Sequence, residues 1–208
     1  MSSSNGDLQR YDDNSRMNHW ALALLFFAAA LSGLAFFHPS LFFLSNLFGG
    51  GTWSRILHPY FGLLMCLSFV GIFVRLRHEN IITDADREWM SKAGALLAGH
   101  KEEMPPVGRY NAGQKLVFWA AGFSLVVLLV TGIVFWHAWF ADFPVWLRRV
   151  GVLLHAVAAF VLVMTVIAHI YAAIWVKGTL RAMTRGTVTR AWAKANHPLW
   201  HRDMTQGK

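Results

Sequence analysis

Four histidines lie within or at the ends of long apolar stretches of this 208-residue sequence: His19, His58, His155 and His169. An ionisable side chain is costly at membrane depth, so such residues are candidates for function. Between His155 and His169 there are fourteen steps along the chain, which on a helix leave them about 40° apart around the axis and about 21 Å apart along it. Because neutral imidazole is a common metal ligand, this spacing predicts two metal centres, each with one ligand on the same helix face.

The elements that must position these histidines are four apolar runs. Hydrophobic residues make up 55% of the chain and charged residues only 14%. The runs cover about residues 18–37, 55–77, 112–136 and 149–176, and each holds the ~20 residues that a helix needs to cross a bilayer. We therefore expect an all-α membrane protein with one domain over residues 1–208, a four-transmembrane-helix bundle with a loop at about 78–111 and a tail at 177–208.

The basic residues predict how these helices are oriented. Sixteen of the nineteen Lys and Arg residues fall within 1–16, 75–115 or 177–208. By the positive-inside rule, both termini and the middle loop are cytoplasmic. This orientation accounts for the net charge of +8 without nucleic acid. This topology pairs His58 with His155 at the outer level and His19 with His169 at the inner level.

The rest of the composition limits the kinds of metal site that these histidine pairs could form. Cys66 is the single cysteine, so thiolate-ligated clusters and covalent haem attachment are excluded. Two haems b, each held by two imidazoles inside an apolar bundle, need only the four histidines. The alternatives from another class are a metal transporter or a haem-free membrane anchor. Transporters usually add intramembrane carboxylates, and the four runs contain no Asp or Glu, so we favour haem.

Small and basic residues near the outer histidines have two interpretations each. Gly33, Gly62 and Gly132 could let a porphyrin approach the backbone or could serve helix packing. Arg55, one turn before His58, could pair with a haem propionate or anchor the span end. We interpret the other histidines as interfacial or solvated, namely His38, His78, His100, His137, His197 and His201.

A second polar cluster precedes the third apolar run, in the segment GRYNAGQK. Asn111 and Gln114 lie three residues apart and so share a helix face, where they could hydrogen-bond the carbonyl of a quinone while Gly113 leaves room for its ring. The alternative is a helix N-cap that begins at Asn111. The two interpretations are compatible. A quinone here would take protons from the cytoplasm and electrons from outside, which couples its reduction to a membrane potential.

The sequence resembles the gamma subunits, or b-type cytochromes, of respiratory formate dehydrogenases of the N and O type. The resemblance extends over essentially the whole chain, and it is carried by the segments RMNHW, ALSGLAFF, RILHPYFG, GRYNAGQK, LLVTG, LLH, HIYAAIWVKG and WAKANHPLW. The sequence departs from the family's pattern in a longer acidic leader before Arg16 and in a shortened outer connection at about 141–144. Neither departure removes a candidate ligand.

The resemblance implies a specific role for these residues. It implies an outer haem b on His58 and His155, an inner haem b on His19 and His169, and reduction of menaquinone near Asn111, Gly113 and Gln114. It further implies an iron–sulfur beta subunit that delivers electrons from a molybdenum- or tungsten-type catalytic alpha subunit on the outer face, so this chain would not itself oxidise formate. The resemblance also implies a location in the bacterial cytoplasmic (inner) membrane. Cytochromes b of nickel–iron hydrogenases share the four-span plan, so a hydrogenase or another iron–sulfur dehydrogenase is the alternative electron donor.

Overall fold

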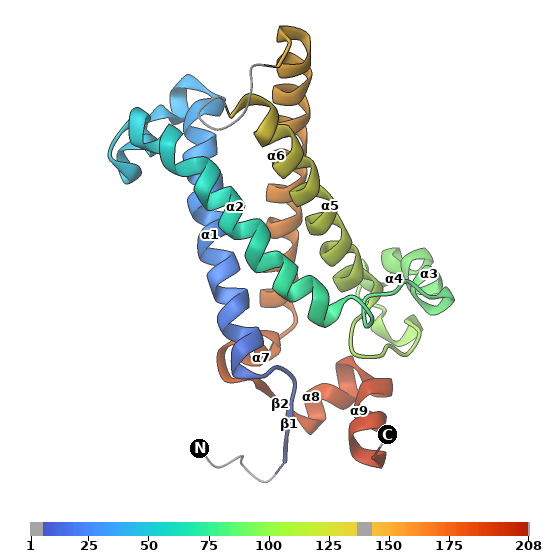
Figure 1. Ribbon diagram of the computed structural model, residues 1–208. Helices are drawn as coiled ribbons and strands as arrows, with labels where there is room; N and C mark the ends of the chain where they lie inside the picture. Colours follow the sequence, from blue (N-terminus) through green and yellow to red (C-terminus); the bar gives the residue numbers. More distant parts are fainter. Residues whose placement is uncertain (1–5, 137–142, 208) are drawn as a thin grey trace. The chain divides into compact units, whose positions relative to one another are not determined.

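The computed structural model describes residues 6–136 and 143–207, and its fold is dominated by helices (Figure 1). The described part contains four helices long and apolar enough to cross a membrane. They are α1 (Asp13–Phe37), α2 (Gly51–Leu76), α5 (Ala112–Phe135) and α6 (Val145–Trp175). The expected all-α class with four spans is confirmed. His137 and part of the outer connection, residues 141 and 142, lie outside the described residues.

The connection between α1 and α2 is itself helical. A 3-10 helix, η1 (Pro39–Phe48), begins where the Nδ1 of His38 accepts a hydrogen bond from the backbone N–H of Ser40. Gly49 and Gly50 then take the left-handed φ values of 86° and 96°, which glycine adopts without a steric penalty. Helix α2 begins directly afterwards, and Pro59 lies in its interior.

The chain divides into two compact units. The bundle unit comprises residues 17–74 and 120–167, and the terminal unit comprises residues 1–16, 75–119 and 168–208. The core of the bundle unit takes one side chain from each long helix, namely Ala29, Met65, Leu125 and Leu162. Contacts among these four side chains hold α1, α2, α5 and α6 together.

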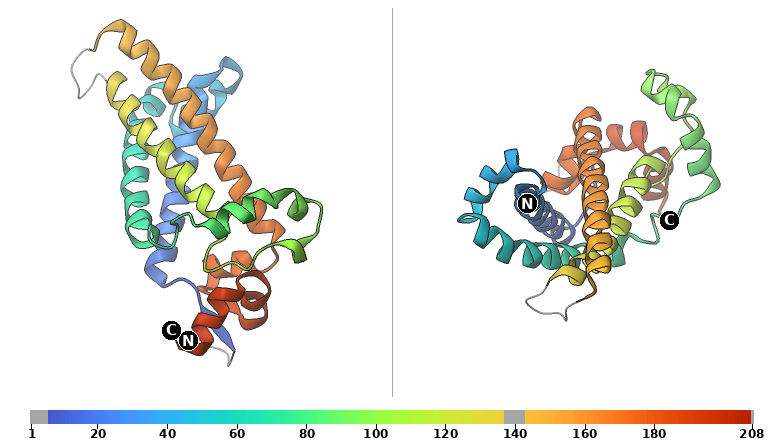
Figure 2. Two further views of the ribbon diagram at one scale, coloured as in Figure 1. Left: turned by 90° about the vertical axis from the view of Figure 1, so that its right-hand side faces the viewer. Right: turned by 90° about the horizontal axis from the view of Figure 1, so that it is seen from above.

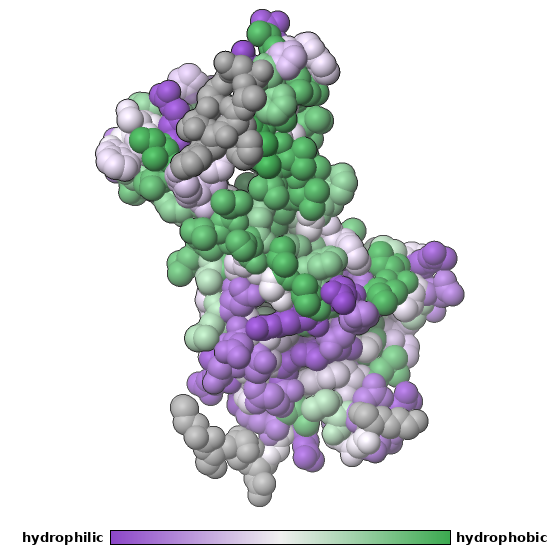
Figure 3. Space-filling view, viewed as in Figure 1, coloured by the Kyte–Doolittle hydropathy of each residue, from purple (hydrophilic) through white to green (hydrophobic). Residues whose placement is uncertain are grey.

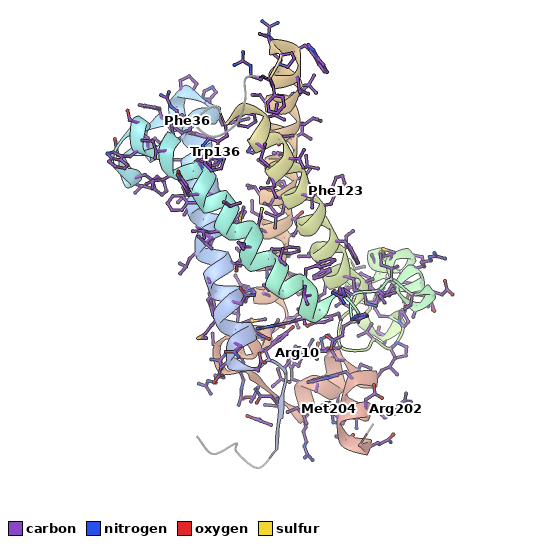
Figure 4. All side chains as sticks on the ribbon, viewed as in Figure 1. Arg10, Phe36, Phe123, Trp136, Arg202 and Met204 are labelled. Atoms are coloured by element: carbon purple, nitrogen blue, oxygen red, sulfur yellow. The ribbon has the colours of Figure 1, made fainter. Side chains whose placement is uncertain are left out.

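Most of the remaining apolar surface of the bundle unit faces outward. Leu24 and Phe123 are 71% and 73% exposed, and the space-filling view shows hydrophobic side chains along the long helices (Figure 3). In Figure 4, Phe123 projects away from α5. Exposed apolar side chains around helices whose backbone bonds are internally satisfied are what a hydrocarbon environment requires.

The terminal unit contains a small sheet that the sequence did not indicate. Strand β1 (Asp7–Gln9) of the leader pairs antiparallel with β2 (Thr187–Thr189) of the tail, and the register places Leu8 opposite Val188. The left view of Figure 2 shows the blue leader strand beside the red helices of the tail. Helices α7 (Thr179–Arg185), α8 (Arg190–Asn196) and α9 (Pro198–Gln206) surround it. The buried core of this unit consists of Leu8, Ala182, Val188, Ala193 and Trp200.

The middle loop is also largely helical and belongs to the terminal unit. It forms α3 (Asp84–Ser91), α4 (Ala93–Leu97) and the short 3-10 helix η2 (Lys101–Glu103). Thr83 and Asp86 form a capping box at the start of α3, which satisfies backbone N–H groups that a helix end leaves without intrahelical partners.

Arg10 joins the leader, the middle loop and the tail. It is buried, its Nη2 donates to the carbonyl oxygen of Arg109 at 2.6 Å, and the same nitrogen lies 3.4 Å from the Nε2 of His197. The Nδ1 of His197 lies 2.9 Å from the carbonyl oxygen of Gly108. His197 is therefore buried and hydrogen-bonded, which corrects its interpretation as a solvated or interfacial residue.

Candidate functional site

The structure brings His58 and His155 together inside the bundle unit. His58 lies on α2 and His155 on α6, both side chains are half-buried, and their ring centroids are 6.2 Å apart with an interplanar angle of 65°. The Phe135 ring contacts His155 edge-on, with centroids 5.1 Å apart. Two imidazoles from different helices thus lie next to each other, with an aromatic side chain against one of them.

The separation of these rings fits two ligands of one metal ion. A metal–imidazole bond is about 2 Å long and the ring centre lies about 1.2 Å beyond the nitrogen, so two imidazoles on opposite sides of an ion have centroids about 6.4 Å apart. The 6.2 Å observed agrees with this value. Within residues 6–136 and 143–207, no group of three or more His, Cys, Asp or Glu residues could hold an ion. The pair therefore suits a metal whose other ligands come from a porphyrin.

Both rings are held at Nδ1 by a hydroxyl group from a neighbouring helix. The Ser32 hydroxyl oxygen on α1 lies 3.0 Å from His58 Nδ1, and the Thr131 hydroxyl oxygen on α5 lies 2.9 Å from His155 Nδ1. His58 Nδ1 is also 3.1 Å from the carbonyl oxygen of Ala29. With Nδ1 engaged in this way, Nε2 is the ring nitrogen left for a metal.

Sequence analysis did not identify Ser32 or Thr131. A signal was present, because each is a hydroxyl residue followed directly by glycine in an apolar helix, at Ser32-Gly33 and at Thr131-Gly132. What the sequence lacked was the distance between each hydroxyl and its histidine, since the partners lie on different helices.

The glycines next to these hydroxyl residues make room for the imidazoles. A Cβ atom added at Gly33 would lie 2.9 Å from Cε1 of His58, and one added at Gly132 would lie 3.7 Å from Cε1 of His155. A Cβ atom at Gly62 would meet nothing within 4 Å. The absence of a side chain at Gly33 is therefore needed for the close approach of His58. At Gly132 a methyl group would make only an ordinary contact with His155, and at Gly62 no histidine is close.

The inner candidates, His19 and His169, are divided between the two units. His19 lies on α1 in the bundle unit, where its ring contacts Trp20 edge-on with centroids 5.5 Å apart. His169 is an exposed residue on the part of α6 that belongs to the terminal unit. Helix α6 is continuous from Val145 to Trp175, so it carries both His155 and His169. Pairing of His19 with His169 remains a prediction.

The polar cluster at the start of α5 forms a reciprocal helix cap. The side-chain oxygen of Asn111 accepts from the backbone N–H of Gln114 at 2.9 Å, and the side-chain oxygen of Gln114 accepts from the backbone N–H of Asn111 at 3.0 Å. This arrangement is a capping box, so the structure supports the interpretation of Asn111 as a helix N-cap. Since the cap uses the two amide oxygens, each side chain keeps its NH₂ group as a donor.

A buried ion pair holds the middle loop against this helix start. The Lys115 ammonium lies 2.7 Å from an Asp86 carboxylate oxygen and donates to the carbonyl oxygen of Ile81 at 2.9 Å. Burial raises the pKa of Asp86, but hydrogen bonds from Lys115 and Thr83 outweigh it and hold that pKa below its ordinary value. The Trp89 ring of the same loop lies against Gly113, where an added Cβ would be 3.4 Å from its Cη2. The middle loop therefore packs directly against the start of α5.

Comparison with known proteins identifies relatives over nearly the full length. The profile of the prokaryotic cytochrome b561 family matches residues 10–186. The cytochrome b556(fdo) subunit of an Escherichia coli K12 formate dehydrogenase is 44% identical over 196 residues, which are 94% of this chain and 92% of the relative. The nitrate-inducible cytochrome b556(Fdn) subunit of the same organism is 40% identical over 194 residues, 93% and 89% of the two chains. A formate dehydrogenase cytochrome b556 subunit of Haemophilus influenzae is 36% identical over 200 residues, 96% and 84%.

Proposed function

We propose a specific task for this chain within the family to which it belongs, the prokaryotic cytochromes b561 that include the cytochrome b556 subunits of formate dehydrogenases. It relays electrons inward across the bacterial cytoplasmic membrane through two haems b and reduces menaquinone near the cytoplasmic side. Its relatives are named as subunits of formate dehydrogenases. We infer that its partners are an iron–sulfur beta subunit and a molybdenum- or tungsten-type catalytic alpha subunit of such an enzyme.

The observation that carries this proposal is the pair of imidazoles 6.2 Å apart with both Nδ1 atoms engaged by hydroxyl oxygens. Bound haem b supplies an iron that accepts and releases one electron at a time. His58 and His155 hold it at the outer level, and His19 and His169 hold a second one at the inner level. Because α6 provides a ligand to each, this helix sets the spacing of the two centres.

The proposed topology draws support from the terminal unit. The leader, the middle loop and the tail hydrogen-bond to one another through Arg10, Arg109 and His197. Segments that fold together must lie on the same side of a membrane, and these three carry most of the basic residues. The positive-inside rule then assigns that side to the cytoplasm.

The amide donors at the start of α5 suit a quinone. A quinone carbonyl only accepts hydrogen bonds, and the reciprocal cap leaves the NH₂ groups of Asn111 and Gln114 for it. Gly113 adds no side chain where Trp89 approaches. Reduction to the quinol takes two electrons from the haem side and two protons from the cytoplasm, so each turnover contributes to the proton-motive force.

The first experiment is haem quantitation, with a reduced-minus-oxidised spectrum, on the complex purified with this subunit. We expect two haems b per chain. His58→Ala and His155→Ala should each remove the same haem component, while His19→Ala and His169→Ala should each remove the other. Retention of both haems by His155→Ala, or absence of haem from the parent protein, would refute the proposal and return these histidines to ion binding or helix packing.

The electron donor is tested separately on the same preparation. Reduction of a menaquinone analogue should depend on formate. Reduction that responds to hydrogen and not to formate would instead assign the chain to a hydrogenase.

A further inference from the structure

We propose that Ser32 and Thr131 are positioning residues that fix the tautomer of the two outer imidazoles and lower the reduction potential of the metal centre they hold. The inference rests on the proposed function, since it takes His58 and His155 as the ligands of the outer haem. It goes beyond that function because it assigns the tuning of the centre to two hydroxyl groups.

The direction of each hydrogen bond follows from counting protons. A hydroxyl group has a single proton to donate. The Ser32 hydroxyl oxygen lies 2.7 Å from the carbonyl oxygen of Ala28, and the Thr131 hydroxyl oxygen lies 2.7 Å from that of Val127. Each carbonyl is closer to the hydroxyl than the imidazole Nδ1 is, so we assign the hydroxyl proton to the carbonyl. Toward the imidazole each hydroxyl oxygen can then only accept, so Nδ1 of each histidine carries the proton. The lone pair on Nε2 is therefore free for a metal.

The carbonyl of Ala29 supports the same tautomer for His58. A carbonyl oxygen has no proton to donate, and that of Ala29 lies 3.1 Å from His58 Nδ1. Both neighbours of this nitrogen are acceptors in this arrangement, so a proton on Nδ1 satisfies them and a lone pair there would repel them.

The arrangement occurs twice, once in each pair of consecutive long helices. On α1 and on α5 a hydroxyl residue followed by glycine faces a histidine of the next long helix, 26 residues later in one case and 24 in the other. Ser32 is fully buried and Thr131 is 5% exposed. A buried hydroxyl destabilises the fold unless it is hydrogen-bonded, and alanine or valine would fill these positions without that requirement.

An imidazole that donates a hydrogen bond from Nδ1 is a more basic ligand at Nε2. A more basic ligand stabilises the oxidised iron relative to the reduced iron, so loss of the hydrogen bond should make the outer centre easier to reduce. Replacing partners of this kind typically changes metal affinity or activity by about 10- to 100-fold. We expect the reduced-to-oxidised ratio of the outer haem at fixed ambient potential to rise by roughly tenfold, which is about 59 mV for one electron.

The test compares Thr131→Val with Thr131→Ser in the purified complex. Valine has nearly the shape of threonine but lacks the hydroxyl, whereas serine keeps the hydroxyl and loses a methyl group. Each haem is titrated potentiometrically by its absorbance, and its low-spin resonance spectrum is recorded. The component missing from His155→Ala identifies the outer haem. Ser32→Ala applies the same measurement to the other ligand, where we expect a smaller shift because the Ala29 carbonyl oxygen still accepts from His58 Nδ1.

We expect Thr131→Val to keep both haems, with a higher potential and an altered resonance spectrum for the outer haem alone, and Thr131→Ser to match the parent. Loss of the outer haem in Thr131→Val but not in Thr131→Ser would support the same role. An unchanged outer potential in Thr131→Val, or equal effects of the two variants, would overturn it. Failure of the proposed function would be seen separately, as absence of the outer haem from the parent complex.

Discussion

Gly33 offers a sharp test of how closely the outer site is packed. In Gly33→Ala the new Cβ would lie 2.9 Å from Cε1 of His58, whereas carbon atoms in good contact are about 3.5 Å apart or more. The imidazole or the backbone of α1 must therefore move by about 0.6 Å. Binding constellations work within about 0.5 Å of their proper geometry, so this shift is enough to disturb a ligand bond.

The magnitude can be bounded from similar packing changes. Inserting a methyl group into a filled site typically costs about 1–3 kcal/mol, which corresponds to a haem dissociation constant raised by about 5- to 150-fold. Alanine also gains about 1 kcal/mol of helix propensity over glycine, but that gain is common to every Gly→Ala change in these helices.

The matched controls are Gly132→Ala and Gly62→Ala. At Gly132 the added Cβ would be 3.7 Å from the His155 ring, an ordinary contact, and at Gly62 it would meet nothing within 4 Å. Haem retention is measured by absorbance after extended dilution of the detergent-purified complex. We expect the outer haem to be lost preferentially from Gly33→Ala. Equal retention in all three variants would refute the conclusion that Gly33 serves the histidine.

Two further predictions concern the start of α5 and the loop that covers it. Gln114→Glu keeps the side-chain oxygen of the cap but removes its NH₂ donor. The KM for a menaquinone analogue should therefore rise about tenfold, while both haems remain bound. An unchanged KM would mean that Gln114 caps the helix and does not bind the quinone. Asp86→Asn leaves Lys115 buried without its ion pair and should destabilise the terminal unit by about 3 kcal/mol, measured as a lower thermal midpoint at pH 7. Because the folded pKa of Asp86 lies below its ordinary value, the carboxylate's contribution is complete above about pH 4 and is lost as pH falls through the folded pKa; a difference between parent and variant that does not shrink on acidification would contradict this assignment.

Features that depend on a single segment of the chain are predictable from its amino-acid order alone. Span number follows from run length, because a bilayer of fixed thickness demands about 20 apolar residues. The shared face of His155 and His169 follows from the helical period. The cluster at 111–114 was recognisable for the same reason, since its capping bonds join residues only three apart.

Side-chain contacts between different helices came only from the three-dimensional packing, although the topology had already paired His58 with His155 by depth. The contacts from Ser32 to His58 and from Thr131 to His155 depend on how neighbouring helices are rotated about their axes, and an apolar run carries no information about that rotation. Likewise, the pairing of β1 with β2 brings Asp7 opposite Thr189. This pairing could not be predicted, because the pattern of a three-residue strand is too short to be recognised alone. Local periodicity places a ligand on a helix face, but only packing between helices supplies the partner that orients it.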